Sequence, residues 1–198
     1  MDSATRKQRL VRLAVALAIS AACIAGVVIY LTIFYDNFHP VIEGKVYRSA
    51  QLDFDGFVHR ITNHGIRSVL NLRGLHPGSE WYDAETNACV QLGVAHYSVS
   101  LSARREPSDD TLTNIVALLR QAPKPVLIHC ARGADRTSLV AAMYMRMFEG
   151  HNDDQARDQI SWRFGHITLL APATLAMDRS FDRFCTHEFF TNVLATAE

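Results

Sequence analysis

The first pattern along the chain is a continuous apolar run near the N-terminus. From Leu13 to Tyr35 the sequence contains no Asp, Glu, Lys or Arg. At a rise of roughly 1.5 Å per residue, a helix over 13–35 would be about 34 Å long, which is enough to cross the hydrocarbon core of a bilayer. The pattern therefore predicts a transmembrane helix over 13–35.

Beyond residue 45 the pattern changes to short apolar segments that alternate with amphipathic ones. The short segments have the length and apolar character of buried strands, and we expect strands over 45–49, 67–72, 94–101 and 125–130. The amphipathic segments carry apolar residues at three- and four-residue spacing, and we expect helices over 54–63, 80–92, 108–122, 137–148, 153–164 and much of 172–194. This alternation predicts an α/β fold with a central, mainly parallel sheet of about four or five strands flanked by helices.

The two patterns divide the chain into four parts. We expect a basic N-terminus over 1–12, the transmembrane anchor over 13–35, a short tether over 36–45 and one folded domain over 46–198. Basic residues precede the apolar run and acidic residues follow it, so the positive-inside rule places the N-terminus in the cytoplasm. The folded domain of this single-pass protein then lies on the periplasmic or extracytoplasmic side.

A cleaved signal peptide is the competing interpretation of the N-terminus, because a basic start followed by an apolar run also suits that class of segment. The run continues past Cys23 to Phe34, which is longer than the apolar region of an ordinary signal peptide, and no small-x-small cleavage site follows it. Residues 20–23 match a lipoprotein processing site only in part, since the usual leucine is missing. An uncleaved anchor accounts better for the sequence.

The composition of the chain excludes several kinds of partner and site. The chain has 20 basic and 20 acidic residues and a pI near 7.1, so its charge indicates no nucleic-acid partner. Its four cysteines are too few and too scattered for a disulfide framework or a paired-cysteine zinc site, and its nine histidines show no metal-ligand spacing. One cysteine, Cys130, is followed six positions later by an arginine, Arg136, and no other cysteine has this spacing.

The segment from Cys130 to Arg136 connects the last predicted strand to the next helix. Backbone N–H groups at a helix N-terminus have no partner within the helix, and together with the helix dipole they favour a bound anion and a cysteine thiolate. We therefore expect Cys130 to be a nucleophile and Arg136 to hold two phosphate oxygens through its planar guanidinium group. Gly133 permits a tight turn around the anion. The expected phosphate-binding residues are Ala131, Arg132, Gly133, Ala134, Asp135 and Arg136.

Two flanking residues are expected to support this loop. His129 precedes the cysteine and can orient the loop or form a hydrogen bond with Cys130, and Thr137 can donate its hydroxyl to the cysteine sulfur. The competing interpretation is a buried cysteine beside two surface arginines. It explains the sequence less well, because Arg132 and Arg136 would then oppose the dipole of the helix that begins there.

With its flanking residues the loop reads His129-Cys130-x5-Arg136-Thr137, and it resembles the signature of the cysteine-based protein tyrosine phosphatase superfamily, in particular its compact dual-specificity branch. Residues 46–184 fit the order of elements expected in that domain. The resemblance implies a phosphocysteine intermediate and neither a metal nor another cofactor. Ser138 departs from the pattern, since many members carry glycine there.

Two acidic residues are candidates for the general acid. The resemblance implies an aspartate on a mobile loop before the cysteine, but residues 95–105 contain no acidic residue. Glu106 lies at the far end of that region and is not already suited to capping a helix. Asp135 is the other candidate, because Cys-x-x-Gly-x-Asp-Arg-Thr resembles the loop of myotubularin-type and some bacterial lipid-active phosphatases, where the in-loop aspartate is implicated in proton transfer. Alternatively, Asp135 only forms an ion pair with Arg132 or Arg136.

The predicted mouth of the site is basic, because Arg132 lies in the loop and Arg104 and Arg105 lie in the segment expected to face it. The resemblance implies proteins phosphorylated on tyrosine, serine or threonine as substrates. A basic mouth on a domain held beside a membrane also suits a phospholipid headgroup, such as a phosphoinositide or phosphatidylglycerophosphate. Both substrate classes remain open at this point.

Two other function classes compete with a phosphatase. A non-catalytic phosphate-binding module would use Arg136 and the loop amides without needing Cys130. A rhodanese-like sulfur transferase also uses a loop cysteine, but an arginine six residues later followed by threonine favours phosphate chemistry. Turnover assays with a phosphomonoester and with thiosulfate distinguish the three classes.

Overall fold

The computed structural model describes residues 3–34, 36–186 and 191. Its core is one five-stranded sheet with the strand order β1-β2-β5-β3-β4. β1 is antiparallel to β2 and all other neighbouring strands are parallel, which confirms the predicted α/β fold with a mainly parallel sheet. The strands are β1 (His39–Ile42), β2 (Val46–Ser49), β3 (Ser68–Asn71), β4 (Ala95–Ser98) and β5 (Val126–His129).

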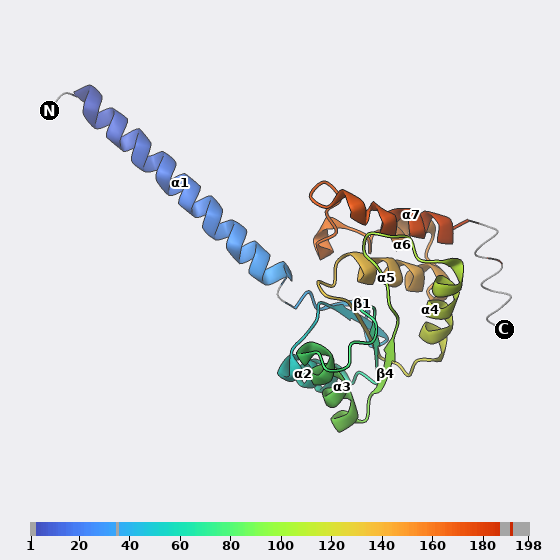
Figure 1. Ribbon diagram of the computed structural model, residues 1–198. Coiled ribbons are helices and arrows are strands. Elements are labelled where there is room, and N and C mark those ends of the chain that lie inside the picture. Colours follow the sequence, from blue (N-terminus) through green and yellow to red (C-terminus); the bar gives the residue numbers. More distant parts are fainter. Residues whose placement is uncertain (1–2, 35, 187–190, 192–198) are drawn as a thin grey trace.

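Helices cover both faces of the sheet (Figure 1). One layer is formed by α2 (Phe54–His64) and α3 (Glu80–Leu92). The other layer contains α4, α5, α6 and α7. The elements after α3 are α4 (Asp109–Gln121), α5 (Asp135–Phe148), α6 (Asp153–Arg157), the 3-10 helices η1 (Trp162–Phe164) and η2 (Pro172–Thr174), and α7 (Leu175–Phe184).

The central strand β5 explains why two separate cores form. Val126 and Ile128 pack in the core beneath α4, α5 and α7, whereas Leu127 packs in the core beneath α2 and α3. Successive side chains of a strand point to opposite faces, so a continuous apolar strand supplies both layers. β5 ends at His129, and the chain leaves the sheet at the carboxyl edge, where ligands bind in folds of this type.

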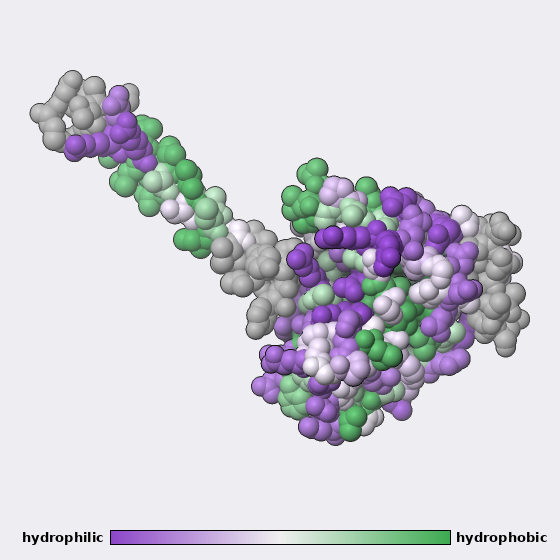
Figure 2. Space-filling model, viewed as in Figure 1, coloured by the Kyte–Doolittle hydropathy of each residue, from purple (hydrophilic) through white to green (hydrophobic). Residues whose placement is uncertain are grey.

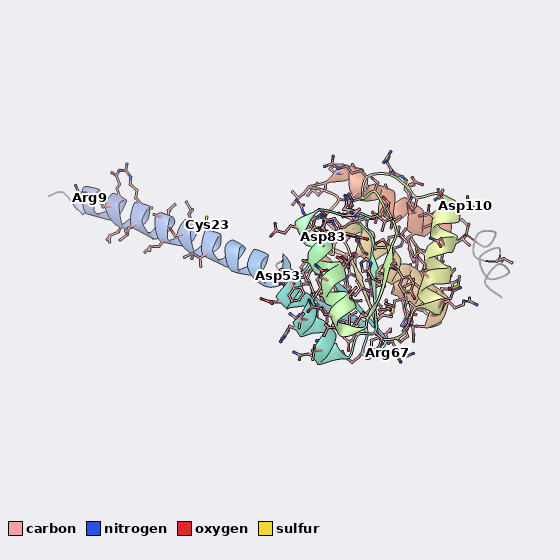
Figure 3. The ribbon with its side chains drawn as sticks, turned by 60° about the horizontal axis from the view of Figure 1, so that its bottom comes forward. Arg9, Cys23, Asp53, Arg67, Asp83 and Asp110 are labelled. Carbon is pink, nitrogen blue, oxygen red and sulfur yellow. The ribbon has the colours of Figure 1, made fainter. Side chains whose placement is uncertain are left out.

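The N-terminal helix α1 (Ser3–Phe34) extends away from the domain. Figure 3 shows its side chains, including Arg9 and Cys23, standing apart from the folded part. From Gln8 to Gly26 the helix is apolar and long enough to cross a membrane, and no part of this window is buried in the protein. The expected anchor over 13–35 lies on this helix, apart from Tyr35, which is outside the described residues.

The segment 36–45, expected to be a tether, belongs to the folded domain. Residues 39–42 form β1, which pairs with β2 along the edge of the sheet. The Asp36 carbonyl accepts a hydrogen bond of 2.7 Å from Ala50 N–H, and the Asn37 side chain is buried. The edge strand supplies backbone partners that a search for apolar periodicity does not reveal. Only residue 35 separates the end of α1 from this anchored segment.

The helix expected over 153–164 is interrupted. α6 begins with a capping box between Asn152 and Gln155 but ends at Arg157, and η1 starts only at Trp162. Beyond Arg157 the backbone forms three-residue turns, from Gln159 N–H to the Ala156 carbonyl at 3.2 Å and from Ile160 N–H to the Arg157 carbonyl at 2.7 Å. Arg48 donates to the Gln159 carbonyl at 3.1 Å and to its side-chain oxygen at 3.0 Å, which fixes this non-helical path. In the expected helix over 172–194, α7 ends at Phe184, and residues 187–190 and 192–194 lie outside the described part.

Candidate active site

The loop with the expected chemistry joins the central strand to the N-terminus of a buried helix. Residues 130–134 lie between β5 and α5, which starts at Asp135, two residues before the expected start. α5 has no side-chain cap, so its first-turn N–H groups remain available to an anion. Cys130 sits at the base of the loop with 2% of its surface exposed. The Cys130 side chain therefore lies close to the point where the helix end would hold an anion.

Gly133 is required for the loop to pack against β2. Its φ of +65° lies in the left-handed region, and a Cβ atom there would lie 2.6 Å from both the carbonyl carbon and the oxygen of Ser49. Contacts this short with backbone atoms cannot be relieved by a side-chain rotation. The loop therefore has no room for a side chain at this position.

Gly133→Ala is expected to destabilise the protein by about 3 kcal/mol or more, because it adds a steric clash to the roughly 1–2 kcal/mol cost of a left-handed alanine. Gly93→Ala is the matched control, since Gly93 has a φ of +66° and a Cβ there would meet nothing within 4 Å. Denaturant unfolding of both variants measures the difference. Equal losses of unfolding free energy would contradict the packing role of Gly133.

Arg48 on β2 holds the loop from beneath. It is fully buried and donates through Nη2 to the Gly133 carbonyl at 2.8 Å and to Ser138 Oγ at 2.7 Å. Its guanidinium group also lies over the Phe164 ring at 3.9 Å. Burial lowers the pKa of Arg48 to about 9, although the negative charge of Cys130 opposes this shift. Ser138, which departs from the family pattern, here supplies a hydrogen-bond acceptor to this arginine.

Arg136 reaches across the carboxyl edge of the sheet. Its Nη1 donates to the carbonyls of Leu72, after β3, and Leu101, after β4, both at 3.3 Å. Its Nε is buried and has no hydrogen-bond partner among the described residues. Two backbone carbonyls thus fix one side of the guanidinium group, which leaves donors for an anion in the loop.

A second arginine at this edge, Arg73, was not identified from the sequence. Burial lowers its pKa, and so does the nearby charge of Arg136, while Glu85 and Cys130 oppose the shift. Its Nη1 donates to Gln51 Oε1 at 2.8 Å, and its guanidinium group stacks on Trp81 at 3.4 Å. The available signal was its place directly after β3, which neighbours β5 in the sheet.

His129 belongs to a buried charged cluster below the loop. Its Nε2 lies 3.1 Å from Oε1 of Glu85, which is fully buried and also bonds His96 Nε2 at 2.6 Å and Gln51 Nε2 at 2.8 Å. Burial raises the pKa of Glu85, but the charge of His129 and these hydrogen bonds outweigh it and hold the pKa at about 2. Gln51 N–H also donates to the Ala131 carbonyl at 3.3 Å. The cluster therefore connects His129 to the loop.

Asp135 does not pair with either loop arginine but with a histidine. Its Oδ1 lies 2.8 Å from His166 Nδ1, and His166 Nε2 lies 2.9 Å from Asp178 Oδ2 on α7. Burial lowers the pKa of His166, but the hydrogen bonds and charges of the two aspartates raise it further, so the net shift is upward. Both ring nitrogens can donate at the same time only in the imidazolium form, which the two aspartates favour.

Glu106, the other candidate acid, is held by α7. Its carboxylate forms ion pairs with Arg179 Nε at 2.7 Å and Arg183 Nη1 at 3.3 Å. Arg183 also donates to the Pro107 carbonyl. These contacts occupy both carboxylate oxygens with surface arginines.

Thr137 is buried below the loop, whereas the three arginines expected at the mouth of the site lie at the surface. Thr137 Oγ1 is buried and has no hydrogen-bond partner among the described residues, so the expected bond to the Cys130 sulfur is not formed in this structure. Arg132, Arg104 and Arg105 are exposed.

Within the described residues, no group of three or more His, Cys, Asp or Glu side chains is arranged to hold a metal ion.

A cavity of about 430 Å³ opens beside the loop. Its lining includes Arg132, Ala134 and Asp135 from the loop and the start of α5, and Ile167, Leu170 and Ala171 from the segment before α7. The cavity therefore has both charged and apolar residues in its lining.

The fold is similar to those of solved phosphatase structures. TpbA from P. aeruginosa matches with a TM-score of 0.61 and 22% identity, covering 83% of this chain and 92% of TpbA. The catalytic core of the PP-IP phosphatase Siw14 from S. cerevisiae matches with a TM-score of 0.57 and 24% identity over 72% of this chain and 83% of Siw14. PTPMT1 matches with a TM-score of 0.56 and 18% identity over 81% of this chain and 98% of its own.

No curated protein matches the chain in sequence. The family model described as a DSP-PTPase phosphatase fused to NAD+ kinase matches residues 28–171, which include all five strands and the loop from Cys130 to Arg136. This match covers well over half of the chain. The chain therefore belongs to this family of dual-specificity-type phosphatases, within the cysteine-based protein tyrosine phosphatase superfamily.

Proposed function

We propose that the chain hydrolyses phosphomonoesters through a phosphocysteine intermediate on Cys130. The observation that carries this proposal is the position of Cys130 at the end of the central strand, below the uncapped N-terminus of α5, with Arg136 extending from the first turn of the same helix. The phosphate oxygens would lie on the loop N–H groups and on the free donors of Arg136. These groups stabilise the charge that spreads over the equatorial oxygens during transfer.

The reaction proceeds in two steps in this proposal. The Cys130 sulfur attacks phosphorus, the bond to the leaving oxygen breaks, and that oxygen takes a proton from the acid. A water molecule then attacks the phosphocysteine, gives its proton to the same carboxylate, and releases inorganic phosphate and the thiolate. Each proton that leaves the acid in the first step returns in the second.

Asp135 is the acid that the geometry favours. It lines the cavity beside the loop, and its Oδ1 is held 2.8 Å from His166 Nδ1. Glu106, in contrast, has both oxygens in ion pairs with arginines of α7. The sequence left the two candidates open, and the contacts support Asp135.

A phospholipid headgroup is the substrate class that we propose. The cavity lining combines a basic residue of the loop, Arg132, with the apolar residues Ile167, Leu170 and Ala171, which suits an anionic head with an adjoining apolar part. The same loop lies close to the end of α1, which we propose to be an uncleaved anchor with a cytoplasmic N-terminus and the domain on the extracytoplasmic side. A phosphorylated protein is the second candidate, favoured by the structure of a TpbA variant in complex with pTyr.

Phosphate release by the full-length protein in vesicles tests whether the substrate is a phospholipid or a phosphorylated protein. We expect turnover of phosphatidylglycerophosphate or a phosphoinositide in the same vesicles to exceed turnover of a phosphotyrosine peptide by at least about tenfold in kcat/KM, because the apolar wall contributes only to the lipid transition state. Activity confined to the peptide would overturn the lipid proposal but leave the phosphatase intact. Turnover of thiosulfate alone would contradict both.

A further inference from the structure

The segment between η1 and α7 is an exposed apolar surface outside the catalytic loop. Residues 167–175 contain no charged side chain. Leu169 is 88% exposed and Leu170 is 78% exposed, and Trp162 at the start of η1 is 69% exposed. We call Trp162, Leu169 and Leu170 the apolar corner. Figure 2 shows hydrophobic atoms gathered at this corner of the domain, on the side toward α1.

The apolar corner lies where the chain enters the domain from α1. Asn37 Nδ2 donates to the Phe164 carbonyl, at the end of η1, and to the Arg132 carbonyl in the catalytic loop, both at 2.9 Å. α1 itself contacts η1. In Figure 1 the loop before α7 and the end of α1 lie on the same side of the domain. One buried side chain, Asn37, therefore ties together the entry point, the corner and the loop.

The short connection limits where the domain can lie relative to a membrane. α1 ends at Phe34, and Asp36 is already bonded to Ala50 of the domain. The two steps of chain from Phe34 to Asp36 span at most about 7 Å, so the domain cannot move far from the membrane surface. The surface beside Asn37 must then face that membrane closely.

We propose that the apolar corner docks into the bilayer that α1 crosses. The composition fits the interface region, because a tryptophan beside Arg163 and two leucines resembles the aromatic and basic anchors found at membrane surfaces. A second protein would have to reach a surface already confined beside the membrane, so the bilayer is the occupant that the geometry favours. The docking rests on α1 as the anchor and does not depend on the proposed chemistry.

Docking of the apolar corner would place the cavity beside the lipid headgroups of the bilayer. Leu170 belongs both to the apolar corner and to the lining of the cavity, which also includes Arg132. A lipid phosphate at the surface would then have its apolar part against the corner and its anionic part at the loop, without leaving the bilayer. This arrangement supports a phospholipid headgroup as the substrate.

Fluorescence of the full-length protein in phosphatidylcholine–phosphatidylglycerol vesicles with brominated acyl chains tests the docking. The chain has two tryptophans, so Trp81→Phe leaves Trp162 and Trp162→Phe leaves Trp81 as the reporter. We expect brominated lipids to remove most of the Trp162 emission and to leave Trp81 emission unchanged. Trp162 emission that aqueous iodide quenches and brominated lipid does not would overturn the proposal. Protection of Trp162 from both quenchers would also overturn it, in favour of a protein–protein contact.

Leu169→Asp provides a second readout, with Val90→Asp as the matched control. Val90 is 80% exposed and lies on α3, in the layer on the opposite face of the sheet. In the Trp81→Phe background, Leu169→Asp is expected to lose lipid quenching of Trp162 and to reduce turnover of vesicle lipid, whereas Val90→Asp preserves both. Both variants should hydrolyse a small aryl phosphate at the same rate as the Trp81→Phe protein without the second substitution. Docking without turnover of any phosphomonoester would contradict the proposed function and not the docking.

Discussion

Cys130→Ser is expected to reduce kcat/KM for a small aryl phosphate by on the order of 10⁴-fold or more, as for other enzymes that lose their nucleophile. A serine hydroxyl is far less ionised than a thiol at neutral pH, so it cannot attack phosphorus at a comparable rate. The base of the loop should remain intact, because the bonds from Arg48 to Gly133 and Ser138 do not involve the cysteine side chain.

The control for this variant is Cys185→Ser, since Cys185 is a free cysteine at the end of α7 with no arginine at the required spacing. It should retain activity close to that of the unaltered protein. Thermal unfolding of both variants excludes a general loss of structure. If Cys130→Ser retained kcat/KM within about tenfold of the unaltered protein, the nucleophile would have to be another group.

Asp135→Asn is expected to reduce kcat by about 10²–10⁴-fold for an alkyl phosphate or lipid, because the leaving oxygen then lacks its proton donor. The loss should be much smaller for p-nitrophenyl phosphate, whose leaving group departs without a proton. The asparagine keeps a hydrogen-bond partner for His166, so the contact with the segment before α7 can persist. Steady-state rates over a series of leaving groups measure the difference.

Glu106→Gln is the matched comparison for Asp135→Asn. Its carboxylate contacts Arg179 and Arg183, so its replacement should weaken two surface ion pairs and leave the leaving-group dependence unchanged. The opposite outcome, in which Glu106→Gln suppresses alkyl phosphate turnover and Asp135→Asn does not, would transfer the acid role to Glu106. That result would require the segment around Glu106 to move toward the loop.

Four of the five strands and most of the helices followed from the sequence, because these elements have a strong local pattern. The expected helix over 80–92 has the same limits as α3, and Ser108 caps α4 by accepting a hydrogen bond from Thr111 N–H, as its residue type suggested. The loop could be located for the same reason, since Cys130 and Arg136 lie within one contiguous segment. The apolar strand before this segment and the helical pattern after it predict that it connects β5 to α5.

Long-range partners could not be inferred from those local patterns. Arg48 and Gln159 are 111 positions apart, and Asp135 and His166 are 31 apart. Apolar periodicity specifies which face of an element is buried, but not which polar group from another element arrives there. The same limit explains why residues 39–42 were not recognised as a strand, since its stability comes from pairing with β2.

Detection of the covalent intermediate tests the central claim most directly. The full-length protein is mixed with a small aryl phosphate, quenched in acid within milliseconds and digested, and the peptide that contains Cys130 is examined by mass spectrometry. We expect a mass increase of one phosphoryl group on that peptide, absent in Cys130→Ser and more abundant in Asp135→Asn, where the second step lacks its base. Phosphate release without any phosphorylated Cys130 peptide, and with the label elsewhere or nowhere, would contradict the mechanism.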